Sequence, residues 1–424
     1  MHVTRRLADF AVGQVAGDGA LAMMRLSLAD WAACGIAGAG EPVAGLLREM
    51  VLAEDGAGQA ALFGGGRVPA RGAALVNGAA SHALDYDDTH FAHIGHPSVA
   101  VVPAALAVAE HVGADGAAFL KACLVGAELS IRVGVWLGRA HYQAGFHQTA
   151  TAGAFGAAAA AGRILGLDAG QMAHALGLSA TRAAGLKSQF GTMGKPYNAG
   201  IAAATGVEVA MLARAGFVST PEGLEVAQGF GATHAGEADE RAFDGLGQDW
   251  RFETVSHKFH ACCHGTHAML EALAGLDVAP EAVEAVELRT HPRWLTVCNL
   301  AEPRTGLEAK FSYRMTAAMA LAGVDTGAMA SFSDAVCLDP VLVGLRDRVT
   351  VVADESVAET AARVKVRVGQ VLTAEHDLEA PMTLEDRERK LRAKGRALIG
   401  DRSQAVWDAV MNGPDIRGLT TQMG

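Results

Sequence analysis

The sequence predicts a mainly helical protein with a smaller α+β part. From the start of the chain to about Gly265, apolar segments of helical length are separated by short glycine-containing turns, as in a helical bundle. Beyond Glu281, apolar and polar side chains alternate with the period of two that is typical of strands. After Pro381 a charged helical segment follows. We therefore expect a helical domain, an α+β lid domain inserted before the C-terminal helix, and a return to the helical domain, over residues 1–261, 262–378 and 379–424.

The helices of the first part are predicted from apolar segments and from their end signals. We expect helices over residues 21–37, 70–83, 98–111, 115–137, 147–165 and 198–215. Gly35 should break the first of these, and Pro103 should kink or restart the third. Asp168 with Gln171 three residues later has the pattern of a capping box. Pro221, which follows a threonine, is expected at the first position of a further helix.

The second part combines strands with helices. Alternating side chains predict strands over residues 286–290, 349–353 and 363–368. Helices are expected over residues 262–273 and 310–322. Thr383, with Asp386 three residues later, should cap the charged C-terminal helix.

The composition indicates a large core made of small side chains. The chain has 424 residues, of which 50% are hydrophobic, and a mean hydropathy of +0.20. Aromatic residues make up only 5%, whereas 51 residues are glycine. Small side chains let helix backbones approach closely, so we expect tightly packed helices in two or three domains.

The charge and the cysteines limit the function classes. A net charge of −11 argues against nucleic acid as the main partner, so an anionic ligand would need a local basic pocket. None of the six cysteines forms a CxxC pair, which predicts a reduced, cytoplasmic chain. The N-terminal residues lack a continuous apolar signal core, and the longest uncharged run, 140–162, contains histidines and glycines. We therefore expect neither a leader nor a membrane span.

The most unusual stretch is residues 81–98, SHALDYDDTHFAHIGHPS, which we call the polar island. It gathers three aspartates and four histidines between apolar, alanine-rich segments: Asp85, Asp87, Asp88, His82, His90, His93 and His96. Such a cluster is costly to desolvate unless its members are paired or used. It is a candidate catalytic loop between two helices, and the alternative is a turn with solvated histidines.

Three further segments concentrate reactive side chains. His147 opens an alanine-rich helix in GFHQT, where a helix-capping or core histidine is the alternative. Lys195 lies in the glycine-rich GTMGKPYN, where a lysine and a helix N-terminus can meet an anion, unless the lysine is simply solvated. The third is HKFHACCHGTH, residues 257–267, at the predicted domain junction, and clefts between domains are favoured ligand sites.

The same segments also contain residue types that bind metals. His260, His264 and His267 have helical spacing, and the polar island offers aspartates, so zinc or iron is an alternative. The spacing matches no closed zinc pattern and no HExxH is present, so we expect no metal. The sequence also has no dinucleotide-binding, P-loop or nucleophile-elbow motif, which disfavours nucleotide-dependent chemistry and serine hydrolysis.

These segments, in this order, resemble the MmgE/PrpD family, which includes 2-methylcitrate dehydratase, cis-aconitate decarboxylase and iminodisuccinate epimerase. The matching runs are VNGAASHALDYDDTHFAHIGHPS, GFHQTATAGAFGAAAA, MGKPYNAG, KFHACCHGTH and GLEAKFSYRMTAAMAL. The resemblance spans nearly the whole chain. It implies a large helical domain, a smaller lid, a homodimer with its site in the cleft, and no metal or organic cofactor.

The resemblance also implies roles for individual residues. Asp85, Thr89 and His96 fall on active-site positions of the first motif, and His147 falls on the histidine of the GFH motif. Lys195 and Lys258 fall on lysines expected to face substrate carboxylates. Cys263 stands where the decarboxylase branch has a histidine, and Tyr313 lies near the tyrosine of the FS helix. The HIGHPS segment is one residue longer than in that branch, which also disfavours a decarboxylase.

The leading hypothesis is a cofactor-independent lyase, similar to the 2-methylcitrate dehydratases, that acts on a small di- or tricarboxylate. Lys195 and Lys258 would stabilise a developing enediolate, and His96 and His147 would be the acid–base pair. Asp85 would orient a neighbouring histidine or raise its pKa. The alternatives are an epimerase of an imino- or amino-dicarboxylate, a decarboxylase and a helical binding protein without activity.

Overall fold

In the computed structural model, which describes residues 2–424, the chain forms two compact units. The helical unit contains the described residues up to His257 together with Ile399–Gly424, and the second unit is Lys258–Leu398. The sequence-based domain limits were 261/262 and 378/379, whereas the structural units change at 257/258 and 398/399.

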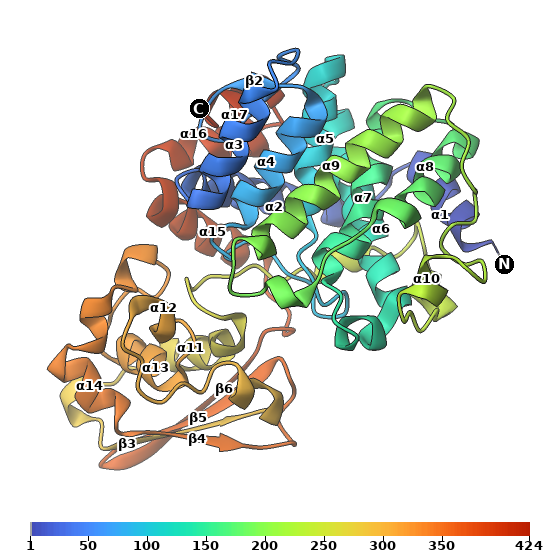
Figure 1. The fold of residues 1–424 in the computed structure, drawn as a ribbon. Helices are drawn as coiled ribbons and strands as arrows, with labels where there is room; N and C mark the ends of the chain where they lie inside the picture. Colours follow the sequence, from blue (N-terminus) through green and yellow to red (C-terminus); the bar gives the residue numbers. More distant parts are fainter. Residues whose placement is uncertain (1) are drawn as a thin grey trace. The chain divides into compact units, whose positions relative to one another are not determined.

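The helical unit consists of long helices with one small hairpin (Figure 1). Its α-helices are α1 (Val3–Val12), α2 (Asp18–Gly38), α3 (Pro42–Ala53), α4 (Ala70–His82), α5 (Ser98–Val112), α6 (Gly116–Gln143), α7 (Gln148–Ile164), α8 (Ala169–Arg182), α9 (Gly194–Arg214), α10 (Phe230–Thr233), α16 (Arg402–Met411) and α17 (Ile416–Thr421). The hairpin pairs β1 (Ala60–Ala61) with β2 (Arg67–Val68), and short 3₁₀ turns are η1 (Lys187–Gln189), η2 (Glu240–Phe243) and η3 (Arg251–Thr254).

Glycine and alanine set the close approach of the central helices α4, α5, α7 and α9. A Cβ at Gly78 of α4 would lie 2.9 Å from the Cα of Gly200 on α9, and one at Gly206 of α9 would lie 2.4 Å from Ala157 of α7. A Cβ at Gly153 of α7 would similarly lie 2.8 Å from the side chain of Ala100 on α5. These contacts place the end of α4 and the beginnings of α5, α7 and α9 at the same end of the bundle. Three of the four sequence segments predicted to carry chemistry lie at these helix ends, and the fourth, residues 257–267, does not.

Several helices differ from their predicted limits. α2 continues through Gly35, whose missing side chain makes room for the ring of Phe63, since a Cβ there would lie 2.2 Å from it. α5 also continues through Pro103 without a restart. Pro221 lies in a turn, so the predicted helix start there is wrong. The predicted capping box of Asp168 is confirmed by both of its hydrogen bonds.

The second unit contains a four-stranded sheet with helices. The strands are β3 (Ala285–Thr290), β4 (Val349–Ala353), β5 (Ala361–Val368) and β6 (Gln370–Asp377), in the order β4-β3-β5-β6. β3 and β4 are parallel, and the other pairs are antiparallel. The helices are α11 (His267–Ala274), α12 (Gly306–Ala309), α13 (Tyr313–Leu321), α14 (Pro340–Arg346) and α15 (Leu384–Ile399), with 3₁₀ turns η4 (His264–Thr266), η5 (Pro280–Ala282), η6 (Pro292–Thr296), η7 (Met329–Ser331) and η8 (Asp334–Cys337).

The buried side chains of β3 and β5 alternate, as the sequence pattern predicted. α11 packs on β5 and β6, and α13 packs on α11 and β4. The fourth strand, β6, was missed because none of its residues is fully buried, so its alternation is weak. The predicted cap of α15 is confirmed, since Thr383 Oγ1 accepts a hydrogen bond from the backbone N–H of Asp386. A mainly helical fold with a smaller α/β part is thus confirmed.

Among the described residues, α2 is long and apolar enough to span a membrane, but 78% of its most apolar window is buried inside the structure. It therefore packs as a core helix of the helical unit.

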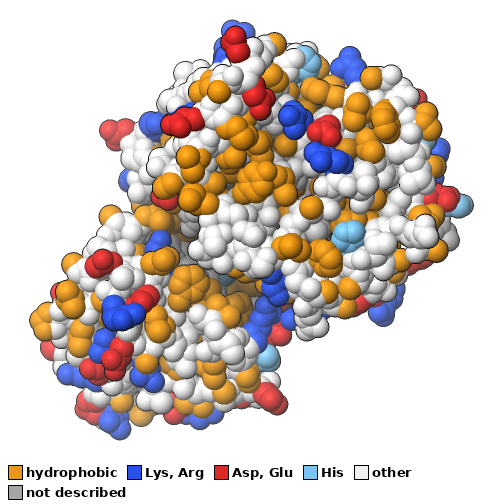
Figure 2. All heavy atoms as spheres, viewed as in Figure 1, with side chains coloured by type: hydrophobic (Ala, Val, Ile, Leu, Met, Phe, Trp, Pro, Cys, Tyr) orange, Lys and Arg blue, Asp and Glu red, His pale blue; other side chains and the backbone are white. Residues whose placement is uncertain are grey.

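On the face seen in Figure 2, lysines and arginines lie among acidic side chains in small mixed groups.

Candidate active site

The polar island begins at the end of α4 and leads to α5 across the N-termini of α7 and α9. The backbone N–H of His96 donates to Thr149 Oγ1 on α7, which fixes the loop against that helix. Lys195 lies in the first turn of α9, because the helix begins at Gly194, earlier than predicted. The helical unit thus brings together Asp85, His96, Lys195 and His147, four of the predicted site residues.

The centre of the cluster is Asp87, which contacts two histidines. His82 Nδ1 donates to Asp87 Oδ1 at 2.9 Å, and His96 Nδ1 lies 2.7 Å from Asp87 Oδ2. All three residues are buried. Burial alone would raise the pKa of Asp87, yet the two imidazoles beside it hold that pKa well below its usual range. Asp87 is therefore an ionised carboxylate that accepts a hydrogen bond from His82 and lies at ion-pair distance from His96.

Asp85 is the more accessible carboxylate of the cluster. Its side chain is 44% exposed, and Oδ1 lies 2.8 Å from Lys195 Nζ and 3.6 Å from His96 Nε2. The backbone of Asp85 is left-handed, with φ 51°, a conformation that aspartate tolerates better than most residues. The turn after α4 thus directs this carboxylate at the first turn of α9.

His147 is the residue immediately before α7, and its ring is buried. Asn198 Nδ2 donates to His147 Nδ1 at 3.1 Å and also donates to the carbonyl oxygen of Leu186. The ring lies 6.1 Å from the ring of His82 and 4.9 Å from that of Phe190. Burial, together with His82, Lys195 and His96 nearby, lowers the pKa of His147 well below its usual value. His147 is therefore neutral near pH 7.

Phe190 is a site residue that the sequence analysis did not identify. Its ring contacts His147 edge-on, and Lys195 Nζ lies 5.4 Å from the ring centroid. The side chain is 38% exposed, unusual for phenylalanine. A partly exposed aromatic ring between a cation and a histidine gives this end of the bundle an apolar wall. Its position in a loop without apolar periodicity left no signal in the sequence.

The other two histidines of the polar island are structural. His90 Nε2 contacts the carbonyl oxygen of Arg251, and His93 packs against Gly134 of α6. Burial lowers the pKa of His90 to about 4 and that of His93 to about 3. Both rings are therefore neutral core groups that hold the loop in place.

Asp88 and Thr89 also anchor the loop. Asp88 accepts hydrogen bonds from the hydroxyl and the backbone N–H of Ser98, at the start of α5. Thr89 and Ser256 exchange two backbone hydrogen bonds of 2.8 Å. The Thr89 hydroxyl also donates to the carbonyl oxygen of Ser256 at 3.4 Å. These contacts show that Thr89 holds the loop in place. Its predicted role in substrate binding stays a prediction.

The remaining predicted residues, Lys258, Cys263 and Tyr313, belong to the second unit. Lys258 is buried. Cys263 is half-buried, and a hydrogen bond with its thiol, together with burial, raises the pKa of Cys298. Tyr313 is fully buried, and its hydroxyl donates to the carbonyl oxygen of Gly265. Their proposed roles toward a substrate remain predictions.

Among the described residues, one set of side chains has the spacing of a metal site. The ligand atoms of His82, Asp85, Asp87 and His96 lie within 4.8 Å of one another. However, both rings already contact Asp87, and Lys195 supplies a positive charge beside Asp85. A divalent ion would have to displace these contacts.

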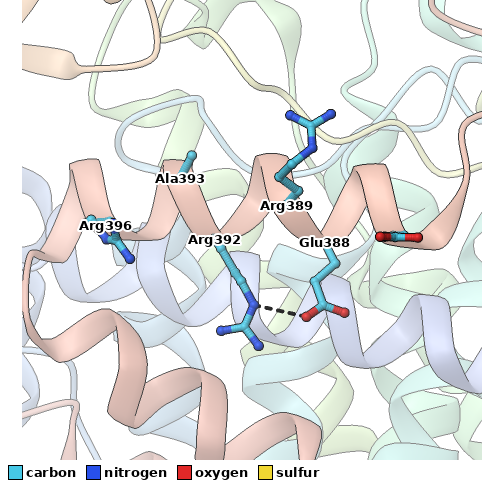
Figure 3. Close-up of a pocket in the computed structure, with 6 residues that line it drawn as sticks. Glu388, Arg389, Arg392, Ala393 and Arg396 are labelled. Carbon is cyan, nitrogen blue, oxygen red and sulfur yellow. Dashed lines mark hydrogen bonds and ion pairs between the residues drawn. The ribbon is translucent and has the colours of Figure 1, made fainter.

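Two surface hollows contain none of the predicted residues. One, of about 560 Å³, lies beside α5 and α17 in the helical unit. The other, of about 340 Å³, follows the exposed face of α15 (Figure 3). There Arg392 pairs with Glu388 at 3.0 Å on the same helix, and Arg389 pairs with Asp386. We interpret this second hollow as a solvated helix face.

The fold and the cluster define a helical protein with an acid–base site of aspartate, histidine and lysine. Comparison with known families assigns it further: residues 5–242 match the family model of the MmgE/PrpD N-terminal domain, and residues 260–412 match that of the C-terminal domain. The chain therefore belongs to the MmgE/PrpD family.

Among curated proteins, similar sequences are cis-aconitate decarboxylases and a related protein. A cis-aconitate decarboxylase-like protein of Aspergillus oryzae is 30% identical over 295 residues, which cover 65% of this chain and 61% of the relative. The cis-aconitate decarboxylase of Aspergillus terreus is 33% identical over 48% of this chain and 45% of the relative. The human enzyme is 36% identical over 40% and 36%. The matches thus span less than two thirds of these relatives.

Proposed function

We propose that this protein is a cofactor-independent lyase that acts on a small di- or tricarboxylate, and that its reaction is the removal of water. The observation that carries the proposal is the cluster of Asp85, His96, Lys195 and His147 in one unit. Elimination beside a carboxylate needs a base for the carbon-bound proton, a donor for the leaving hydroxyl and a cation for the enediolate. This cluster contains each of these groups.

Lys195 is the proposed anchor for a substrate carboxylate. Its ammonium has three N–H donors, so it can keep Asp85 and bind a second carboxylate. In a protein with a net charge of −11, such local capture is required. Lys258 of the second unit is the second proposed carboxylate ligand. His96 and His147 are the proposed catalytic histidines, and Asp85 lies beside His96 Nε2.

A carboxy-lyase is the second candidate, because the similar curated proteins are named cis-aconitate decarboxylases. Cys263 stands where that branch has a histidine, which favours the hydro-lyase. Family membership alone does not decide between them, since one fold carries several reactions. We further propose a homodimer in the cytoplasm, from the family resemblance and the reduced cysteines.

The test is incubation of the purified protein with a panel of hydroxylated and unsaturated polycarboxylates. New ultraviolet absorbance from an unsaturated product, without carbon dioxide, supports the hydro-lyase. Release of carbon dioxide selects the carboxy-lyase instead. Solvent deuterium uptake without either product would indicate an epimerase. If no substrate reacts, the lyase proposal fails.

A further inference from the structure

We propose that His96, held by Asp87, is the base of this site and that His147, held by Asn198, acts as a neutral hydrogen-bond donor. Asp87 and Asn198 are then positioning residues. The inference rests on the proposed lyase function, and it divides the work between two histidines that the sequence leaves equivalent.

The protonation of His96 follows from its contact with Asp87. Asp87 Oδ2 lies 2.7 Å from a ring nitrogen of His96, and so close a contact with a carboxylate oxygen is favourable only when that nitrogen carries a proton. That nitrogen is Nδ1. In the neutral ring Nε2 is then the basic atom, and it is the nitrogen that faces Asp85, the exposed carboxylate. This is the arrangement in which a buried carboxylate orients a histidine and stabilises its imidazolium.

The protonation of His147 is the opposite. The amide orientation of Asn198 is fixed by Leu186, because the carbonyl oxygen of that residue can only accept. Asn198 Nδ2 therefore also faces His147 Nδ1, which must accept its hydrogen bond. In the neutral ring the proton then lies on Nε2. A neutral imidazole of this kind donates a hydrogen bond to an oxyanion and does not take up a proton.

The two rings together support one reaction path. His96 Nε2 takes the proton from the carbon beside the carboxylate, and the C–H electron pair enters the enediolate. Lys195 and His147 Nε2–H stabilise the negative oxygen. The enediolate then collapses, the C–O bond breaks, and the departing hydroxide takes the proton from His96, which yields water and the unsaturated acid. Atoms and charge balance without any other reactant.

The charged and titratable groups around His96 come from α4, the polar island, the residue before α7, and α9. They are His82 of α4, Asp85, Asp87 and His93 of the polar island, His147 before α7, and Lys195 of α9. Of these, Asp87 is in direct contact with the ring. Removal of its charge should lower the affinity of His96 for a proton and so move the acid limb of the pH profile to lower pH.

The first experiment compares Asp87→Asn with Glu128→Gln in the full-length protein. Glu128 is a buried carboxylate of α6 that accepts from the backbone N–H groups of Arg251 and Phe252, outside the cluster. We expect Asp87→Asn to lower kcat by about 100-fold, and to shift the acid limb of kcat/KM by about one pH unit. Glu128→Gln should lower thermal stability without moving the limb. An unmoved limb with normal kcat in Asp87→Asn would overturn the inference.

The second experiment compares Asn198→Asp with Asn77→Asp. Both asparagines are buried, and both donate to a backbone carbonyl, of Leu186 and of Ala61. Only the aspartate at 198 would accept a hydrogen bond from His147 Nδ1–H, which favours the tautomer that has no proton on Nε2. We expect kcat to fall at least tenfold in Asn198→Asp and to stay unchanged in Asn77→Asp. Equal kcat values in the two variants would contradict the assigned role of His147.

A third measurement keeps this inference separate from the proposed reaction. Ring ¹⁵N NMR of histidine-labelled protein near pH 7, assigned with His96→Gln and His147→Gln, reports the protonated nitrogen of each ring. We expect Nδ1–H in His96 and Nε2–H in His147. Reversed positions overturn the inference even if the protein is a lyase. The expected positions without turnover of any polycarboxylate refute the lyase and leave the assignment of the rings in place.

Discussion

Each unit contains a carboxylate in contact with a histidine and a lysine. In the helical unit these are Asp85, His96 and Lys195, and in the second unit they are Glu271, His260 and Lys390. The carboxylate-to-histidine distances are alike, 3.6 Å and 3.5 Å. The side chain of Asp85 is 44% exposed, however, whereas that of Glu271 is 11% exposed. The same three residue types therefore occur in two environments.

The second histidine contact separates the two sets further. His96 is backed by another carboxylate, Asp87, whereas His260 Nδ1 contacts the hydroxyl of Thr326 at 2.7 Å. Lys390, on α15, links that helix to Glu271 on α11. We infer that Glu271, which is buried between its partners, has a structural role and ties α11 to α15 as a clamp. Asp85, which is exposed and lies beside a histidine that contacts a second carboxylate, belongs instead to a reactive site. The predictions below test this difference.

The largest effect is expected from Lys195→Met, which keeps the side-chain length and removes the charge. We predict a fall of about 100-fold in kcat/KM, or about 3 kcal/mol of transition-state stabilisation, by analogy with the loss of one oxyanion donor. Lys258→Met should behave similarly. The thermal midpoint should change little, since an ion pair with an exposed partner contributes little to stability.

Lys390→Met is the matched control. It should lower the thermal midpoint, because Glu271 loses a partner in a largely buried setting, and should leave kcat/KM nearly unchanged. Steady-state kinetics and thermal melts on both variants decide the comparison. A Lys195→Met variant with normal kcat/KM would show that the helical-unit set is a clamp too.

The next effect concerns the acid stability of the second unit. Burial by itself would raise the pKa of Glu271, but His260 and Lys390 lower it from 4.5 to about 2. Because the folded pKa lies below the unfolded one, this stabilisation is present above pH 4.5 and is lost as the pH falls toward 2. The shift corresponds to about 3 kcal/mol at most.

Urea unfolding at a series of pH values from 7 to 3 measures this effect. The stability difference between the wild type and Glu271→Gln should be largest near neutral pH and should shrink as the solution becomes acidic. A difference that is independent of pH would mean that the carboxylate is not ionised in the folded protein, and the clamp would lose its electrostatic basis.

The comparison also shows what the sequence could predict. Periodicity and caps predicted most of the long helices and three of the four sheet strands, since those elements bury one face or carry local end signals, but α1, α3 and the last two helices were not predicted. Asp85, His96, Lys195 and His147 were identified through motifs, and the structure brings these four together. Asp87 and Asn198 lie inside the same motifs, but their roles depend on which ring atoms they contact. Neither composition nor spacing contains that information.

Residue spacing was misleading in two other places. Gly35 was interpreted as a break and Pro103 as a kink or a restart, yet α2 continues through Gly35, where close contact with Phe63 leaves no room for a side chain, and α5 does not restart at Pro103. The sequence did not identify Phe190 as a site residue, because its role depends on His147 and Lys195, which lie beside its ring only in the folded protein.

A smaller effect is expected from Asp88, the neighbour of Asp87. Burial raises the pKa of Asp88 to about 7, and Asp30 and Asp87 add to the shift. The pKa of Asp88 is higher in the folded protein than in the unfolded one. The folded protein therefore loses stability as the pH rises from 3.8 toward 7, because ionisation of Asp88 favours the unfolded state. Asp88→Asn should therefore gain about 2 to 3 kcal/mol at pH 8 relative to pH 5. Thermal melts at the two pH values test this, and a loss that is the same at both would contradict it.

The smallest effect is expected from metal removal. The ligand atoms of His82, Asp85, Asp87 and His96 lie within 4.8 Å of one another, close enough to surround an ion. An ion there would have to displace the contacts of both rings with Asp87 and would face the ammonium of Lys195. We therefore expect full activity after exhaustive treatment with a chelator, and inhibition by added zinc through competition for these atoms. The measurement is kcat/KM before chelation, after it, and after stepwise return of single divalent ions. Activity that is lost on chelation and restored by one ion would make this cluster a metal centre, and the assignment of His96 as a carboxylate-backed base would have to be given up.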